Sequence, residues 1–222
     1  MAISDRKKLE KEQRKQAIVD AAEELFFSKG YDNVSMNDIA NEVGLNRASL
    51  YLYFENKEAV LFTVLLKGLR ILHNLVKNKV KKAVLGHKIY AWGNAYSAFF
   101  NLYPQYRQVY NLFQSKRFDL PEINNFEISY NIAVAAVVRE IIRLQKEMFD
   151  ILHSAVKNLL ISKKILSDVD PFNSSLLIYS SMDSLLNLSP VLENEIRAMN
   201  LNKYQDFKMM LFTQLIKQLF DD

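Results

Sequence analysis

Apolar residues in the first sixty positions repeat at helical spacing in three short stretches. Between residues 10 and 29, they recur every three to four positions and fall on one face of a helix. Gly30 follows as the expected stop, because glycine readily adopts the left-handed conformation that ends many helices. Two shorter stretches cover about residues 36–43 and 47–54, with Gly44 between them. The pattern predicts a three-helix unit.

Polar residues in front of the two short stretches are typical of helix caps. Ser35, with Asp38 three positions later, resembles a capping box, and Asn46 is placed to cap the next helix. Leu50 and Phe54 are four positions apart and are expected to face the core. A short helix, a glycine turn and a second short helix form the outline of a helix-turn-helix.

From residue 57 onward the pattern predicts helices almost throughout. These segments cover residues 57–84, 88–102, 105–116, 124–164, 171–188 and 203–220. They are separated by breaks at Gly86, Tyr103-Pro104, Leu120-Pro121, Asp170-Pro171 and Ser189-Pro190. The predicted fold class is all-α, with an N-terminal three-helix domain over residues 1–56 and a C-terminal helical bundle over residues 57–222.

Composition agrees with this prediction and narrows the setting. Half of the 222 residues are hydrophobic, and only five Gly and four Pro are present, which disfavours a turn-rich β architecture. The absence of cysteine excludes disulfides and thiolate metal sites. The N-terminus is charged, and no stretch of about 18 uncharged apolar residues indicates a membrane span. We therefore expect a cytoplasmic protein without a membrane partner.

Charge is distributed unevenly along the chain. Residues 61–118 contain ten Lys and Arg but no Asp or Glu, whereas residues 1–60 contain nine basic and eleven acidic side chains. A wholly basic block suggests an anionic partner nearby. Six basic groups lie in residues 6–15 and would form an arm or first helical turn along a nucleic-acid duplex.

The sequence offers little that would support catalysis. The histidines, His73, His87 and His153, lack metal-ligand spacing and catalytic partners in the local sequence. No Gly-rich phosphate loop is present. We therefore expect no enzyme activity, no cofactor and no metal.

Residues 35–61, SMNDIANEVGLNRASLYLYFENKEAVL, resemble the signature of the TetR family of transcriptional regulators, and residues 17–36 resemble that family's first helix. Ala48 departs from the pattern, since many members have glycine there. The resemblance implies a homodimer in which each subunit has one helix-turn-helix for double-stranded DNA. It also implies a C-terminal domain that holds a small-molecule effector and the dimer interface, so that effector binding releases DNA.

The second short helix carries the residues expected to contact bases. In a helix-turn-helix, the start of this helix enters the major groove. Arg47 can donate two hydrogen bonds to a guanine edge or bind a phosphate, and Ala48 is small enough to touch a thymine methyl group. Ser49 would reach a base or a phosphate, and Asn37 a base edge. Asn46, directly before Arg47, is also a candidate for DNA contact.

Other groups are expected to bind DNA phosphates. Ser35 caps a helix whose free N–H groups suit an anion. Tyr51 and Tyr53 carry hydroxyls that we place on the outer side of the second short helix, and Lys57 begins the long helix that follows. Binding to DNA should therefore weaken with salt, because phosphate contacts release counterions.

Aromatic residues of the C-terminal part either pack as core or line a ligand pocket, since such pockets are apolar with few polar groups. The candidates for ligand contact are Trp92, Tyr96, Phe99, Phe113, Tyr130, Phe149 and Tyr179. The lysines of the basic block, Lys77, Lys79, Lys81 and Lys82, are spread around a helix. They form either a solvated surface or a site for an anionic headgroup, such as an acyl chain ending in carboxylate or coenzyme A.

The last helices are predicted to form the dimer interface. Residues 203–220 show two apolar stripes, and a helix with two apolar faces is expected to be buried on both sides. Small serines in residues 171–188 would allow close approach of helices. The interface candidates are Leu177, Ser181, Leu185, Phe207, Leu211 and Leu215.

The sequence is compatible with two functions. The first is a ligand-responsive dimeric repressor that binds a palindromic operator. The alternative is a helical interaction protein of the same fold without sequence-specific DNA binding.

Overall fold

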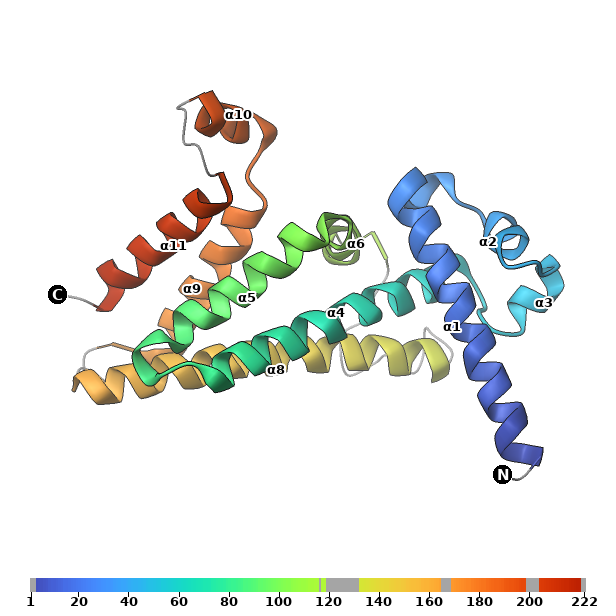
Figure 1. Ribbon diagram of the computed structural model, residues 1–222, viewed down its shortest axis with the longest axis horizontal. Coiled ribbons are helices and arrows are strands. Elements are labelled where there is room, and N and C mark those ends of the chain that lie inside the picture. Colours follow the sequence, from blue (N-terminus) through green and yellow to red (C-terminus); the bar gives the residue numbers. More distant parts are fainter. Residues whose placement is uncertain (1–2, 116, 119–131, 165–168, 199–203, 221–222) are drawn as a thin grey trace. The chain divides into compact units, whose positions relative to one another are not determined.

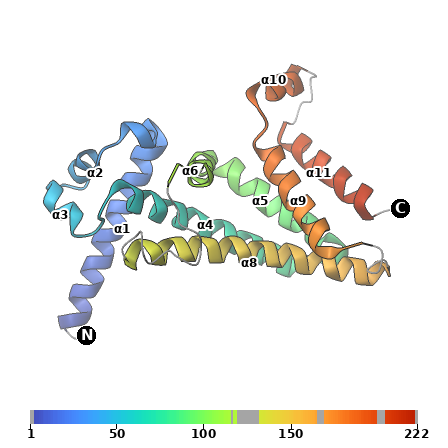
Figure 2. The same ribbon diagram turned by 180° about the vertical axis from the view of Figure 1, so that it is seen from behind.

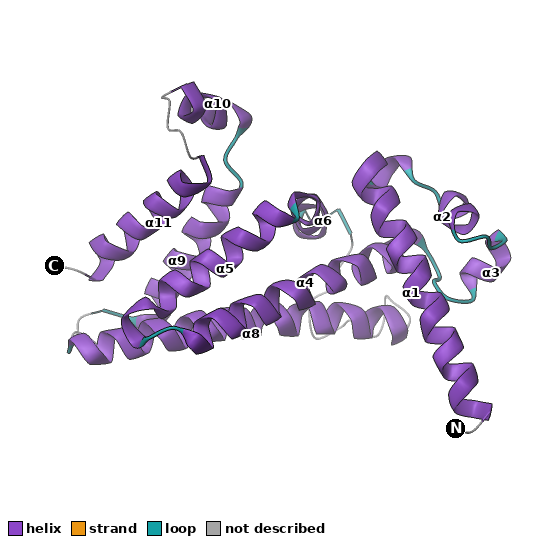
Figure 3. Ribbon diagram, viewed as in Figure 1, coloured by secondary structure: helices purple, strands orange, loops and turns teal. Residues whose placement is uncertain are grey.

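The computed structural model is helical in its described parts, which comprise residues 3–115, 117–118, 132–164, 169–198 and 204–220 (Figures 1 and 3). No strand occurs within these ranges, so the all-α prediction is confirmed. The predicted break at Leu120-Pro121 lies outside the described residues, as do residues 124–131 of the predicted helix 124–164.

Packing divides the chain into two compact units. The first contains Met1–Leu69 and Gln105–Ile142, and the second contains Arg70–Pro104 and Arg143–Asp222. Two long helices, α4 and α8, contribute to both units. This division follows packing rather than chain order, and the boundary predicted after residue 56 stays a prediction.

The first unit contains the predicted helix-turn-helix. It is built by α1 (Ile3–Lys29), the 3-10 turn η1 (Tyr31–Asn33), α2 (Met36–Glu42), α3 (Arg47–Tyr51), the first part of α4 (Lys57–Lys82), α6 (Pro104–Gln114) and the start of α8 (Ile132–Lys163). Helix α1 packs against α2, and α2 packs against α3. Ile18, Ile39 and Leu50, one from each of these helices, are fully buried and form the centre of this core.

The second unit contains the rest of α4 and α8, together with five further elements. They are the 3-10 turn η2 (Leu85–His87), α5 (Lys88–Leu102), α9 (Pro171–Leu186), α10 (Pro190–Ala198) and α11 (Tyr204–Phe220). Helices α5, α9 and α11 pack against one another (Figure 2). Trp92 of α5 is fully buried and donates a hydrogen bond from its indole Nε1 to the Met148 carbonyl of α8 at 3.0 Å.

Two elements differ from the sequence-based expectation. Helix α1 begins at Ile3 rather than near residue 10, because residues 5–16 are good helix formers whose side chains are nearly all exposed. With no core to face, they show no apolar period. Helix α10 was not predicted. It begins at Pro190, and Ser189 caps it by accepting hydrogen bonds from Leu192 and Glu193.

Helix α4 is apolar enough to raise the question of membrane insertion. By length and composition it could cross a bilayer, and it is the single described helix for which this holds. However, 67% of its apolar window is buried by the rest of the protein. The hydrophobicity of α4 is therefore that of a core helix.

Candidate nucleic-acid interface

The turn between α2 and α3 follows directly from the capping residues and one glycine. The Ser35 side chain accepts a hydrogen bond from the Asp38 N–H, and the Asp38 carboxylate accepts one from the Ser35 N–H, so the predicted capping box is present. Gly44 has a φ of 65°, which L side chains rarely adopt. Asn46 caps α3 by accepting a hydrogen bond from the Ser49 N–H at 2.8 Å.

Helix α3 has one buried and one exposed face. Leu50 is fully buried and Phe54, just beyond the helix, is 4% exposed, as their spacing predicts. Arg47, Ala48 and Tyr51 lie on the exposed side. The helix therefore exposes Arg47 and Tyr51 to solvent, while Leu50 holds it against the core.

Arg47 and Tyr51 interact with each other across one helical turn. The guanidinium donates a hydrogen bond to the Tyr51 hydroxyl at 3.4 Å, and its carbon lies 5.7 Å from the centre of the ring. Both residues line an open groove of about 380 Å³, together with Ser35 and Lys57. The structure thus brings together four of the nine residues predicted to contact DNA.

Lys57 has an internal role that the sequence did not reveal. Its amine donates hydrogen bonds to the carbonyls of Tyr31 and Val34, both at 2.8 Å, and lies 4.1 Å from the centre of the Tyr31 ring. Burial lowers the pKa of Lys57, although the nearby charge of Asp32 opposes this shift. An ammonium group has three N–H donors, so one remains for a phosphate. Phosphate contact by Lys57 stays a prediction.

Two of the other predicted contacts, Tyr53 and Asn37, do not line this groove. Tyr53 is half-buried and borders a second groove, of about 660 Å³, with Lys7, Lys11 and Arg14 of α1. The two tyrosines that we placed on one outer side therefore line different grooves. Asn37 is exposed near the start of α2.

Acidic side chains of the first unit are paired with cations from the basic block. Lys67 donates hydrogen bonds to Asp20, at 2.8 Å, and to Glu23. The Tyr106 hydroxyl also donates to Glu23. Burial lowers the pKa of Lys67, but the two carboxylates outweigh burial and raise it above its ordinary value. The charges of Asp20 and Glu23 are thus balanced by Lys67.

Arg117, like Lys67, neutralises an acidic side chain of the first unit. Its partner is Asp32, which lines the same groove as Arg47. The Arg117 guanidinium forms two hydrogen bonds with Asp32, one of them at 2.9 Å, and lies 5.5 Å from the centre of the Tyr31 ring. These hydrogen bonds lower the pKa of Asp32. The roles of Lys67 and Arg117 could not be predicted from the sequence. The only signal was that residues 61–118 contain no acidic residue, so any acidic partner must come from another part of the chain.

The aromatic residues predicted to contact a ligand do not form one group. Trp92, Tyr96 and Phe149 each lie within 6.0 Å of Tyr179, between ring centres, and fill the space with their own side chains. The remaining candidates are Phe99, which is buried beside Phe100; Phe113, which contacts Phe62 in the first unit; and Tyr130, which lies outside the described residues.

The residues predicted to form the dimer interface lie mostly together. Ser181 and Leu185 of α9 and Leu211 and Leu215 of α11 border one shallow hollow of about 380 Å³. Leu177 is 47% exposed, and Phe207 is half-buried. The other apolar stripe of α11, which contains Phe212, Ile216 and Phe220, faces the core, and Phe212 is fully buried. The two predicted faces of this helix are therefore both present.

In the described parts of the chain, no three His, Cys, Asp or Glu side chains are grouped so that they could hold a metal ion. His73 pairs with Glu147 at 3.0 Å. His153 lies 3.3 Å from the Ser175 hydroxyl. Both contacts are within the packing of the second unit.

Comparison with known proteins connects this geometry to a family. Residues 18–64 match the family model described as bacterial regulatory proteins, tetR family. Over 46 residues the chain is 44% identical to the biofilm operon icaADBC HTH-type negative transcriptional regulator IcaR of Staphylococcus epidermidis. That alignment covers 21% of this chain and 25% of IcaR, so the chain matches only about a quarter of the length of this relative.

Two solved structures extend the similarity of fold to most of the chain. The TetR family transcriptional regulator PfmR from Thermus thermophilus has a TM-score of 0.61 at 18% identity, covering 90% of this chain and 97% of PfmR. The transcriptional regulator FadR from Bacillus subtilis, solved in complex with stearoyl-CoA, has a TM-score of 0.59 at 19% identity, covering 92% of this chain and 97% of FadR. Residues 18–64 therefore match the tetR family of bacterial regulatory proteins, and the fold of most of the chain is shared with solved transcriptional regulators.

Proposed function

We propose that the protein is a cytoplasmic transcriptional repressor that binds operator DNA through α3. The observation that carries this proposal is the exposed set of Arg47, Ala48 and Tyr51 on a helix anchored by the buried Leu50. Its start is free to enter a major groove, where arginine can recognise guanine. Similarity to the negative regulator IcaR over 46 residues supports repression.

Titration of DNA from the protein's own upstream region tests this proposal. We expect specific binding, with affinity that falls at least about tenfold between about 50 and about 200 mM salt as counterions are released. Fluorescence anisotropy with a scrambled duplex of equal length provides the control. Equal affinity for both duplexes, or an affinity that does not change with salt, would favour the alternative of a helical interaction protein.

We further propose that two copies associate through the hollow between α9 and α11. Leu185, Leu211 and Leu215 border it and are half-buried. Other apolar residues of the same two helices are accessible, including Leu176 and Leu177 at 47% and Met210 at 51%. Burial of such a face between two copies removes apolar surface from water. Twofold symmetry is the usual arrangement for such an interface and matches the symmetry of a palindromic operator.

Light scattering at micromolar concentration measures this association. We expect a dimer for the natural chain and a monomer for Leu211→Lys, because an unpaired ammonium would be placed in the apolar contact. Leu102→Lys is the matched control, since Leu102 is 70% exposed on α5 and lies outside the hollow. A monomeric natural chain, or a dimeric Leu211→Lys, contradicts the proposed interface.

The repressor is proposed to release DNA when a small molecule binds its second unit. An apolar or acyl ligand with an anionic head fits the basic block and the abundance of aromatic residues. The fold shared with FadR, which was solved with stearoyl-CoA, is consistent with this class of ligand. The aromatic cluster around Tyr179 is filled by its own side chains, so a ligand there would have to displace them.

A further inference from the structure

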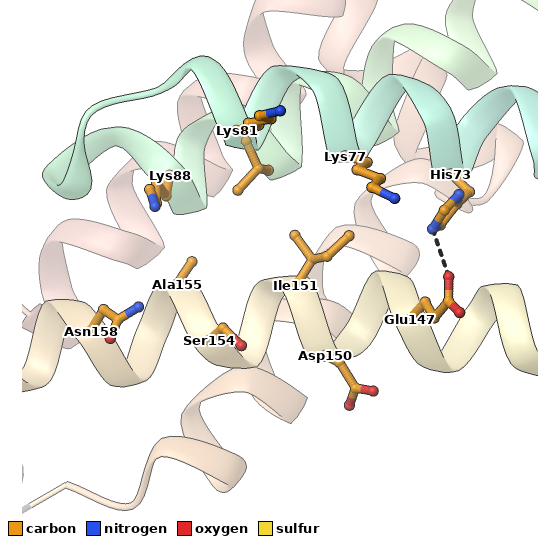
Figure 4. Close-up of a pocket in the computed structure, with 11 residues that line it drawn as sticks. His73, Lys77, Lys81, Lys88, Glu147, Asp150, Ile151, Ser154, Ala155 and Asn158 are labelled. Carbon is orange, nitrogen blue, oxygen red and sulfur yellow. Dashed lines mark ion pairs between the residues drawn. The ribbon is translucent and has the colours of Figure 1, made fainter.

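A groove of about 520 Å³ runs between α4 and α8 in the second unit (Figure 4). Its volume falls within the range of roughly 300–1,000 Å³ that is common for small-molecule sites. None of the six described aromatic residues predicted to contact a ligand is among the residues that line it. It is therefore a separate candidate for ligand binding.

One wall of the groove carries three lysines. Lys77 and Lys81 are four positions apart on α4, so they lie on one face about 6 Å apart along the helix axis. Lys88, the first residue of α5, completes the set, and Figure 4 shows Lys77 and Lys88 on the side that faces α8. No ion pair within the described residues involves these three amines. Their charge is available to a bound anion.

The opposite wall is formed by α8 and has two apolar side chains among polar ones. Ile151 and Ala155 point toward α4 in Figure 4, and Val80 of α4 adds a third apolar side chain. Ser154 and Asn158 border the groove beside them and can form hydrogen bonds. The groove thus combines a cationic side with a side of mixed polarity that has an apolar patch at Ile151 and Ala155.

Two carboxylates, those of Glu147 and Asp150, also line the groove, but neither forms an ion pair with its lysines. Glu147 is held by His73 at 3.0 Å and by Arg143 in an ion pair. Asp150 points away from α4 in Figure 4 and is exposed. The lining therefore has three lysines against two carboxylates, and Glu147 is held by other partners.

We propose that this groove binds an anionic amphiphile, a molecule with a carboxylate or phosphate head and an aliphatic segment. The head lies against Lys77, Lys81 and Lys88, where charge-assisted hydrogen bonds are strong. The aliphatic segment lies over Ile151 and Ala155, which removes apolar surface from water. The site itself does not depend on DNA binding. Only its regulatory consequence, that the amphiphile changes DNA affinity, rests on the proposed function.

Calorimetric titration of the full chain tests the site without DNA. The probes are dodecanoate and dodecyl phosphate below their micelle concentrations. Two further probes each lack one part of these molecules, since inorganic phosphate has no aliphatic segment and dodecanol has no anionic head. We expect saturable binding of at least one amphiphile, stronger than that of either single-part probe. The triple variant K77Q/K81Q/K88Q should bind at least about tenfold more weakly.

The chain supplies a matched control for this loss. Lys79 and Lys82 lie on the same helix and do not line the groove, so K79Q/K82Q should stay within about twofold of the natural affinity. Ser154→Glu, at an exposed position of the opposite wall, adds a carboxylate and should also weaken binding. Equal losses in the triple and control variants, or tighter binding of inorganic phosphate or dodecanol alone, would overturn the proposal.

DNA affinity is then measured with and without the bound amphiphile. A change that disappears in K77Q/K81Q/K88Q supports regulation through the groove. Binding of the amphiphile with unchanged DNA affinity overturns the regulatory consequence but retains the site. Absence of specific DNA binding in the ligand-free chain would contradict the proposed function and leave the result of the calorimetry intact.

Discussion

Arg47→Ala is expected to weaken binding to the operator by about 1–3 kcal/mol for each subunit, which is the usual discrimination of a bidentate arginine–guanine contact. Arg47 is exposed, and its described contacts are with Tyr51 alone. Its removal should therefore leave the packing of Leu50 unchanged, and thermal melting should show an intact fold. Fluorescence anisotropy with operator and scrambled duplexes measures the loss.

The same titrations show whether Arg47 contacts a base or a phosphate. A base contact lowers the ratio of specific to scrambled affinity, whereas a phosphate contact weakens both alike and reduces the salt dependence. Arg139→Ala on α8 removes the same charge from another exposed position and should have little effect. Equal operator affinities for the natural chain and Arg47→Ala would exclude Arg47 from the interface.

Gly68→Ala is expected to destabilise the protein by about 1–3 kcal/mol, the usual result of overpacking a core. In most helices this substitution is favourable by roughly 1 kcal/mol. Here a Cβ atom would lie 2.2 Å from Cε1 and 2.3 Å from Cδ1 of Tyr106. That ring is 3% exposed, is in edge contact with Phe27, and donates its hydroxyl hydrogen bond to Glu23. It therefore has little freedom to move aside.

Urea denaturation of Gly68→Ala and a control variant measures this effect. Gly86→Ala is the control, because a Cβ there meets nothing within 4 Å and the backbone is not in the left-handed region. It should be neutral or slightly stabilising. Adding Tyr106→Ala removes the ring, so the double variant should lose less stability than the sum of the two single losses. Unchanged or increased stability of Gly68→Ala would show that the ring yields.

Helix positions could be predicted from the chain wherever one face is buried. The apolar period predicted the short helices around Ile39 and Leu50, and both residues are fully buried. The prediction failed where helices lack such a face. The first turns of α1 are exposed, and α10 is a nine-residue helix whose Val191 and Leu192 are 69% and 52% exposed. Apolar periodicity records burial, so it carries no information about a helix that is not buried.

The candidate interface could be predicted in part. Its cap residues, Ser35 and Asn46, and the exposure of Arg47 follow from local spacing. The partners of Lys57 could not be predicted, because its carbonyl acceptors belong to Tyr31 and Val34, more than twenty positions earlier. The pairing of Arg117 with Asp32 spans 85 positions. Contacts at such separation depend on how helices pack, which local patterns do not specify.

The sequence by itself determined the all-α class, the helix-turn-helix and the two faces of α3, because each follows from residues within about two helical turns of one another. Only the tertiary structure decided which cations are free. Lys67 and Arg117 are used within the first unit, whereas Lys77, Lys81 and Lys88 meet beside one groove of the second. A uniformly basic block contains no such distinction, since the partner of each charge comes from a helix distant in the chain.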